Sequence, residues 1–203
     1  SSDLEAHKLI EEAMLIANVA AARLLDSANI TGLYRIHEGL RAEKYPALRD
    51  FLNSRGLRLG QNILSAKELN RLLTVTHARQ DFSVLQTLVL RSMTQAVYSP
   101  NNIGHYGLAY DTYTHFTSPI RRYPDLLVHR LIRKIISTQD RAGHAYELAA
   151  LETLAIHTSS TERRADEASR ELVMMLKCGL LQKYVGEVFT GIISSVTHFG
   201  LFV

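Results

Sequence analysis

Two adjacent arginines stand between two prolines in the stretch THFTSPIRRYPDLLVHR, residues 114–130. Pro119, with Ser118 ahead of it, is typical of a helix start, because proline at the first helical position removes a donor that the helix does not use. Pro124 would interrupt a helix at this point, so residues 119–123 are expected to form one tight turn. Free N–H groups, the positive end of a helix and both arginines would then lie together, which predicts an anion site.

The chemistry of the arginine pair has two interpretations. A guanidinium suits a phosphodiester because its planar fork can bond two oxygens. Alternatively, Arg121 or Arg122 forms an ion pair with a carboxylate at the helix start, such as Asp125, and such pairs add little stability on a surface. Spacing alone leaves both interpretations open.

The other titratable residues show no recognisable pattern of metal ligands. The sequence contains no Asp-Asp or Asp-x-Asp, and the aspartates are widely scattered. His105, His115 and His129 lack a zinc-type spacing and lie far from Cys178, so no zinc site is expected. Cys178 has apolar neighbours and is expected to be buried. As the single cysteine it can form no intrachain disulfide, which fits a reducing compartment.

The elements that must position these residues are mainly helical. Between the arginines and the preceding helices, the alternation in GHYGLAYDTYTHF, residues 104–116, predicts a strand with Tyr113 and His115 on one face. LYRIHEG is a short β-type segment, and residues 187–203 predict two strands joined by a turn. Apolar periodicity predicts helices over residues 4–28, 41–55, 65–78, 81–98, 126–137 and 146–184, the last being one helix or two in series with an irregularity at 157–161.

The composition is that of an ordinary globular chain. Of 203 residues, 46% are hydrophobic and 21% charged, which excludes a disordered or fibrous protein. A formal charge of +3 permits nucleic-acid binding without requiring it. No apolar run is long enough for a membrane span, and no signal peptide is recognisable. The chain lacks an initiator Met and stops as a β domain begins, so we expect a fragment of a longer protein.

Several long motifs carry a family resemblance. HYGLAYDTYTHFTSPIRRYPDLLVHRLI resembles the signature segment of the RNB exoribonucleases, the family of ribonuclease II and ribonuclease R, and TSPIRRYPD is closer to the ribonuclease R form. AHKLIEEAMLIANVAAARLL and LYRIHEG resemble the middle of that catalytic domain, TERRADEASRELV its last helix, and GEVFTGIISSVTHFGLFV the start of an S1 domain. The resemblance implies an α+β, mainly helical fragment of the RNB domain at residues 1–184. The first strands of an S1-type OB-fold β-barrel would follow at residues 185–203.

The resemblance also implies a function. The expected parent is a processive, hydrolytic 3′-to-5′ exoribonuclease of the cytoplasm that degrades single-stranded and structured RNA to nucleoside monophosphates with Mg²⁺. Family members hold this metal on clustered aspartates, since hard carboxylate oxygens suit Mg²⁺. This sequence lacks such a cluster. The metal ligands are therefore expected in a missing N-terminal half of the same domain, and the fragment alone is expected to be inactive.

The expected partners are RNA and that missing half, with no membrane and no small-molecule cofactor. The segment would supply the phosphate-gripping side of the RNA channel. The alternative is an RNA-binding or partner-docking module without nuclease activity.

Two positions match catalytic residues of the family. Arg121 matches the arginine of the SPIR motif, which grips the phosphate near the scissile bond and can neutralise charge in the transition state. Glu162 matches a glutamate of the last helix that lines the same cavity. For Glu162 the structural alternative is a solvated helix face, because i,i+4 pairs of opposite charge follow it at residues 163–170.

Further candidates for RNA contact each have a structural alternative. By the same resemblance, Glu12 would accept a hydrogen bond from a 2′-hydroxyl, or it is a surface glutamate. Tyr113 and His115 would stack on or bond to nucleotides, or they are packed in the fold. Arg122 would hold a second phosphate or a carboxylate, and Ser118 lies in the same turn.

The C-terminal segment adds three aromatic rings. In an S1-like barrel, His198, Phe199 and Phe202 would stack on bases, or they form the core of the barrel.

Overall fold

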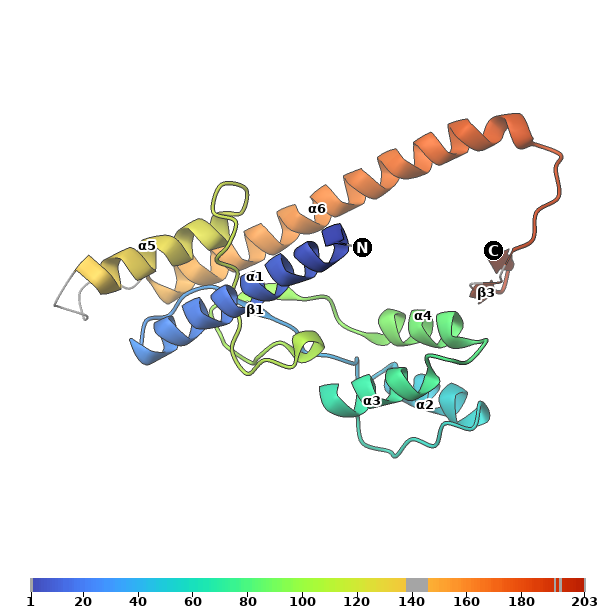
Figure 1. The fold of residues 1–203 in the computed structure, drawn as a ribbon, viewed down its shortest axis with the longest axis horizontal. Helices are drawn as coiled ribbons and strands as arrows, with labels where there is room; N and C mark the ends of the chain where they lie inside the picture. Colours follow the sequence, from blue (N-terminus) through green and yellow to red (C-terminus); the bar gives the residue numbers. More distant parts are fainter. Residues whose placement is uncertain (1, 138–145, 192, 194, 203) are drawn as a thin grey trace. The chain divides into compact units, whose positions relative to one another are not determined.

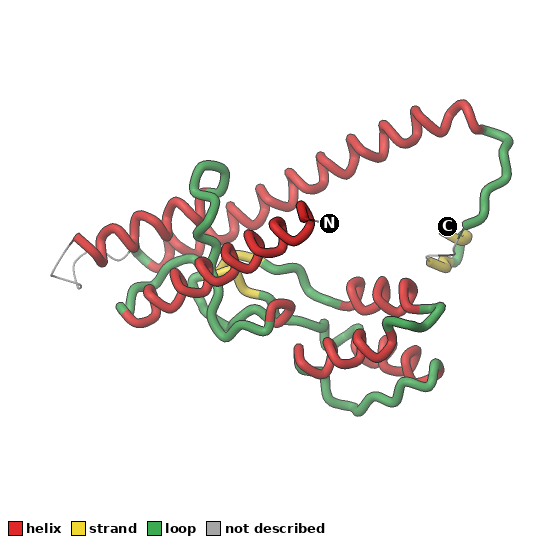
Figure 2. Tube along the Cα trace, viewed as in Figure 1, coloured by secondary structure: helices red, strands yellow, loops and turns green. Residues whose placement is uncertain are grey.

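The computed structural model describes residues 2–137, 146–191, 193 and 195–202. The chain divides into two compact units, Ser1–Ser160 and Thr161–Val203. The elements are drawn in Figures 1 and 2 and follow in chain order: α1 (Ser2–Ser27), β1 (Tyr34–Ile36), α2 (Tyr45–Ser54), α3 (Ala66–Thr76), α4 (Phe82–Ser92), β2 (Val97–Ser99), η1 (Tyr106–Leu108), α5 (Tyr123–Ser137), α6 (Leu148–Leu181), η2 (Gln182–Tyr184), β3 (Ser195–Thr197) and β4 (Gly200–Phe202). The expectation of a mainly helical fold with few strands is confirmed.

One apolar core of the first unit joins α1, α5 and the start of α6, which lie together in Figure 1. Leu25, Leu127 and Leu151 are fully buried there. Burying a leucine side chain contributes about 1.5–3 kcal/mol, so these contacts fix the three helices against one another. This packing sets where the start of α5, and the arginines before it, lie relative to α1.

A second core joins α2, α3 and α4. Leu52, Leu69 and Leu85 are buried in it. The start of α3 is closed by a capping box, in which Ser65 Oγ accepts from Glu68 N and the Glu68 carboxylate accepts from Ser65 N at 2.7 Å. Leu40, which follows β1 in the sequence, is buried in the same core.

The helix expected over residues 81–98 is too long, and this prediction is wrong. Helix α4 ends at Ser92, and Val97–Ser99 forms β2, antiparallel to β1 with Arg35 opposite Tyr98. Tertiary pairing outweighs the helical periodicity here, because Thr94 N donates to Gly39 O at 2.8 Å and carries the chain away from α4. The strand brings the Tyr98 hydroxyl within 2.8 Å of His115 Nδ1, in the segment that precedes α5.

The strand expected over residues 104–116 is also wrong. The segment contains the short 3-10 helix η1 and otherwise irregular backbone. Gly104 and Ala109 have positive φ angles of 79° and 55°, which are incompatible with an extended strand. Tyr113 and His115 therefore do not share a strand face.

The tight turn before the arginine-bearing helix is confirmed. Arg122 N donates to Ser118 O at 3.0 Å, and the chain turns at residues 119–121. Helix α5 begins at Tyr123, earlier than expected, because Pro124 falls in the first turn, where its missing N–H costs nothing. In Figure 1 the turn forms the loop beside the start of α5.

Helix α6 is a single helix that runs through residues 157–161 without interruption. Thr158 Oγ1 donates to Leu154 O at 2.7 Å, so this hydroxyl bonds within the helix instead of interrupting it. In the second unit Cys178 is exposed, and the expectation that it is buried is wrong for this structure, since no described side chain covers it. A hairpin is present within the expected stretch, because β3 pairs antiparallel with β4, but residues 187–191 form no strand, so the expectation over residues 187–203 is confirmed only in part.

Candidate nucleic-acid interface

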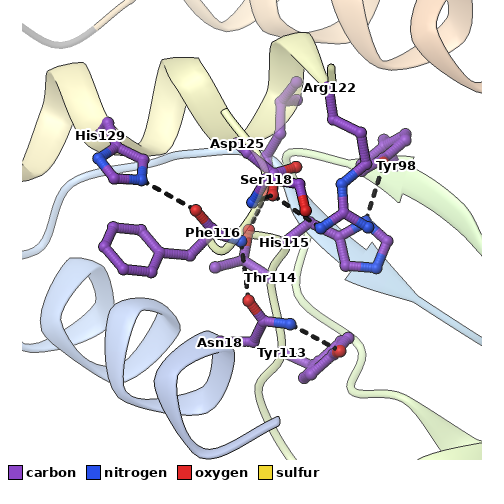
Figure 3. A network of polar contacts seen from close by, with 11 residues as sticks. Asn18, Tyr98, Tyr113, Thr114, His115, Phe116, Ser118, Arg122, Asp125 and His129 are labelled. Atoms are coloured by element: carbon purple, nitrogen blue, oxygen red, sulfur yellow. Dashed lines mark hydrogen bonds and ion pairs between the residues drawn. The ribbon is translucent and has the colours of Figure 1, made fainter. Parts of the chain in front are cut away.

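Residues 113–125, called the pinned segment below, are held to the first unit by buried polar side chains (Figure 3). Asn18 of α1 is 4% exposed and makes two of these bonds. Its Nδ2 donates to the Tyr113 hydroxyl at 3.0 Å, and its Oδ1 accepts from Phe116 N at 2.9 Å. One amide from α1 therefore fixes both a ring and the backbone of the segment.

Two further side chains fix the same stretch. The hydroxyl of Thr114, which is fully buried, donates to Leu33 O. His129 of α5 bonds through Nε2 to Phe116 O at 2.9 Å, and its ring stacks on Phe116 with centroids 4.1 Å apart. Because a carbonyl only accepts, Nε2 carries the proton in this contact. The segment is thus tied to α5 before it turns into that helix.

Asp125 fastens the turn itself. Its carboxylate is fully buried, and Oδ2 accepts from Ser118 N and from Arg122 Nη2, both at 2.8 Å. Asp125 Oδ1 and Arg122 Nε are buried and have no hydrogen-bond partner among the described residues. Removing one partner of a buried ion pair costs about 3–5 kcal/mol, so Arg122 is strongly held by this carboxylate. The ion-pair interpretation of the motif is therefore realised at Arg122.

Arg121 differs from its neighbour. Its backbone N–H donates to Ser118 O at 3.3 Å, which places it in the turn, and its side chain is exposed. Within the described part of the chain, its guanidinium takes part in no ion pair. The turn therefore leaves one of the two guanidinium groups available to an anion.

An aromatic cluster formed by Tyr98, His105, Tyr113 and His115 lies beside the turn. Tyr98 Oη and His115 Nδ1 are 2.8 Å apart, and the Tyr113 ring contacts both histidines, with centroids 5.4 and 5.8 Å away. The guanidinium carbon of Arg35 lies 4.7 Å from the centre of the Tyr98 ring. Aromatic faces and cations are thus interleaved, as in many surfaces that bind nucleic acids.

Both histidines of this cluster are neutral at pH 7. Burial, followed by the charges of Arg122 and Arg35, lowers the pKa of His115 to about 3. Burial, with His37 and Arg35 nearby, lowers the pKa of His105 to about 4. Arginines contribute to both pKa shifts, namely Arg35 at both histidines and also Arg122 and Arg121 at His115, so positive charge lies close to this cluster. A phosphate would meet fixed cations here without having to protonate a histidine.

The structure brings together Tyr113, His115, Ser118 and Arg122 in the first unit (Figure 3), and the backbone of Arg121 lies in the same turn. Tyr113 is 5% exposed and its hydroxyl is bonded, whereas His115 is half-buried. Glu12 is an exposed residue of α1, six positions before Asn18, or about 9 Å along the helix axis.

The other candidates lie in the second unit. Glu162 is a half-buried residue of α6 in that unit. His198, Phe199 and Phe202 belong to the β3–β4 hairpin or its turn. Phe199 is 71% exposed and Phe202 is 51% exposed, and the centres of their rings are 5.9 Å apart.

Sequence reasoning missed Asn18, Arg35 and Tyr98. Asn18 was detectable in principle, because it is a polar residue within the apolar run IANVAAARLL. Arg35 and Tyr98 carried no comparable signal, since their proximity depends on the pairing of β1 with β2, which are 63 positions apart at this pair.

The described residues offer no metal site. Within residues 2–137, 146–191, 193 and 195–202, no group of three or more His, Cys, Asp or Glu side chains can hold a metal ion. The same residues include no helix with the length and apolarity required to cross a bilayer.

Comparison with known proteins shows the family to which this chain belongs. The model of the RNB domain matches residues 1–138. Ribonuclease R of Escherichia coli is 45% identical over 208 residues, which cover 98% of this chain and 26% of that protein. The chain thus spans about a quarter of the length of this curated relative.

Solved structures show the same relationship. RNase R of Mycoplasma genitalium, in complex with ribose methylated single-stranded RNA, matches 97% of this chain and 32% of its own, with a TM-score of 0.87 and 30% identity. Yeast Ssd1, a pseudonuclease, matches 73% of this chain and 19% of its own with a TM-score of 0.63, and at 24% identity it shows likeness of fold alone. Given these matches, the chain belongs to the RNB family and is related along nearly its whole length to ribonuclease R.

Proposed function

We propose that this chain is part of a processive, hydrolytic 3′-to-5′ exoribonuclease that degrades single-stranded and structured RNA to nucleoside monophosphates. In this proposal residues 1–184 belong to the RNB catalytic domain and form the phosphate-gripping side of the RNA channel. The observation that carries it is the turn of the pinned segment, where a buried carboxylate holds Arg122 while Arg121 stays exposed. The ribonuclease R relatives and the RNA-bound neighbour support RNA as the substrate.

Arg121 would act on the phosphate at the scissile bond. Hydrolysis of a phosphodiester develops negative charge on the phosphate oxygens, and a guanidinium carried by a preorganised turn can stabilise that charge. The bonds from Asp125 to Ser118 and Arg122 fix the turn that carries Arg121. Glu162 is proposed as a second residue of the cavity, and Glu12 as the acceptor for a ribose hydroxyl.

Mg²⁺ is the proposed metal of the intact protein. Its ligands are assigned to the missing N-terminal half of the domain, because the described residues of this chain offer no cluster of carboxylates. The chain by itself should therefore be inactive, and RNA degradation by the purified chain would contradict this assignment.

The C-terminal residues 185–203 are proposed to begin an S1 domain. The exposed rings of Phe199 and Phe202, with His198 beside them, fit a surface on which bases stack. A cytoplasmic location is proposed from the single cysteine, which suits a reducing compartment.

A second candidate function is an RNA-binding or partner-docking module without nuclease activity. The likeness of fold to the pseudonuclease Ssd1 shows that this fold also occurs without activity. One experiment separates the two functions. The full-length protein is incubated with Mg²⁺ and an RNA labelled at its 5′ end, and its products are resolved over time. Nucleoside monophosphates released from the 3′ end support the exoribonuclease, whereas binding without any cleavage supports the module.

A further inference from the structure

We infer that Asp125 is a positioning residue that assigns different tasks to the two adjacent arginines, committing Arg122 to the fold so that Arg121 alone meets the RNA phosphate. This inference rests on the proposed function of Arg121. It adds a residue that touches no substrate and acts through the turn.

The first observation is the place of Asp125 in the turn. Its Oδ2 bonds both Ser118 N, ahead of Arg121, and the guanidinium of Arg122, after it, each at 2.8 Å. Figure 3 shows both bonds to the carboxylate, which therefore holds the residues on either side of Arg121 in the sequence. Because the carboxylate has no exposed area, it cannot itself meet an RNA phosphate.

The second observation concerns the atoms that remain unpaired. Asp125 Oδ1 accepts no bond and Arg122 Nε donates none among the described residues, although both atoms are buried. A guanidinium can bond a carboxylate through two parallel N–H groups, so these atoms have the chemistry to complete such a pair. Moving Arg122 onto RNA would instead leave Asp125 with a single donor. The arrangement therefore favours Arg122 staying with the carboxylate when RNA binds.

The third observation is the charge around His115. Arg122 and Arg121 both contribute to the positive potential at this imidazole. Without Asp125, a released Arg122 would compete with Arg121 for one phosphate, and the phosphate would be drawn away from the position set by Arg121. A misplacement of about 1 Å can reduce turnover about 100-fold, so the carboxylate matters for rate more than for affinity.

The test uses the full-length protein and the salt dependence of its affinity for a single-stranded RNA, measured in EDTA so that the RNA is not consumed. Each phosphate contact contributes about 0.7 to the slope of log affinity against log salt concentration for a single strand. We expect Arg121→Gln to lower the magnitude of the slope by about 0.7, and Arg122→Gln to leave it unchanged. We expect Asp125→Asn to raise the magnitude of the slope by about 0.7, because the freed Arg122 then reaches a phosphate. Combining Asp125→Asn with Arg122→Gln should return the slope to the value of the parent.

Turnover gives the second readout. Asp125→Asn should lower kcat about 10- to 100-fold without raising KM, whereas general damage to the fold would lower the melting temperature and the affinity together. The matched control is Asp50→Asn, which alters an exposed carboxylate paired with Arg49 on α2 and should leave kcat unchanged. Should Asp125→Asn fail to fold, the comparison of Arg121→Gln with Arg122→Gln still decides.

Two results would overturn the inference. The first is that Arg122→Gln lowers the magnitude of the slope as much as Arg121→Gln does. The second is that the Asp125→Asn protein folds and has the same slope and kcat as the parent. An unchanged slope for Arg121→Gln alone would instead overturn the proposed role of Arg121. In that case the slopes of Asp125→Asn and of the double variant Asp125→Asn, Arg122→Gln can still be compared. A steeper slope in the single variant than in the double variant would show that the carboxylate restrains Arg122.

Discussion

The pinned segment of the first unit and the β3–β4 hairpin of the second unit both carry aromatic rings, but they hold them in opposite ways. In the pinned segment Tyr113 is 5% exposed and its hydroxyl is bonded to Asn18. In the hairpin Phe199 is 71% exposed, and its ring contacts the rings of His198 and Phe202 beside it.

This difference separates two kinds of contribution to RNA processing. Groups held by several buried hydrogen bonds can place a charge accurately, which matters in the transition state. Exposed rings can stack on any base, which adds affinity with little demand on geometry. The two regions should therefore respond differently to substitution, the first in turnover and the second in binding.

The largest effect is expected from Arg121→Ala in the full-length protein. Loss of a charge-stabilising group should reduce kcat about 10²- to 10³-fold, with a much smaller change in RNA affinity. The measurement is single-turnover cleavage at saturating RNA. Arg130→Ala removes an exposed arginine of α5 and serves as the control. A variant that bound RNA more weakly but kept the parental kcat would place Arg121 with the affinity contacts.

Asn18→Ala should be the next most severe change. It leaves the Tyr113 hydroxyl and the Phe116 N–H without their partner, at a cost of about 1–3 kcal/mol for each buried group. Each kcal/mol lowers the melting temperature of a domain of this size by about 2–4 °C. Thermal unfolding of the full-length protein measures the loss, with the exposed Asn101→Ala as control. Equal melting temperatures for the two variants would show that the segment is not pinned by Asn18.

Phe199→Ala should reveal the contrasting behaviour of the hairpin. Loss of one stacked base should weaken affinity for single-stranded RNA by about 1–3 kcal/mol, while kcat at saturation stays at the parental value. Equilibrium binding and single-turnover kinetics measure the two quantities separately, and Phe199→Tyr keeps the ring as a control. A large loss of kcat with unchanged affinity would remove the distinction between the two regions.

A smaller effect is expected on acid stability from His115→Gln. His115 has a pKa of about 3 when folded and an ordinary pKa near 6.5 when unfolded, so below pH 6.5 the unfolded chain binds a proton that the folded protein does not. Stability is therefore retained above pH 6.5 and lost as pH falls toward 3. Because glutamine does not titrate, the free energy of unfolding of the variant should fall by about 1 kcal/mol less than that of the parent between pH 7 and pH 5. The difference is this small because partial exposure of His115 weakens the effect.

Melting temperatures of parent and variant at pH 7 and pH 5 provide the measurement. An identical fall for both proteins would mean that His115 is not held neutral by its surroundings.

The sequence predicted the parts of the fold that depend on local periodicity. The helices, the turn before α5 and the C-terminal hairpin follow from apolar spacing, proline chemistry and alternation. It failed where tertiary contacts outweigh local preference. Val97–Ser99 leaves the helical pattern to pair with β1, and residues 104–116 are broken by the positive φ angles of Gly104 and Ala109.

The candidate site was predictable in the same uneven way. Local motif chemistry identified Arg121, Arg122 and Asp125 as neighbours, because all three lie within five positions. Spacing could not decide which arginine the carboxylate holds, since that depends on which side chain turns inward at the start of α5. Tyr98 was beyond reach, because it meets the pinned segment through long-range packing. Asn18 stood out as a polar residue in an apolar run, but its partners in the pinned segment also depend on long-range packing.

The most direct test is a binding cycle between single arginines and single RNA linkages. A neutral methylphosphonate replaces one phosphate at a time near the 3′ end of an RNA, and affinity is measured in EDTA for the full-length parent, Arg121→Ala and Arg122→Ala. We expect to find one linkage whose neutralisation weakens RNA binding by the parent but causes no further loss in Arg121→Ala. For Arg122→Ala, we expect the effect of the protein substitution and the effect of the neutral linkage to add at every position. Additive effects of Arg121→Ala at all linkages, or coupling that appears only with Arg122→Ala, would contradict this expectation.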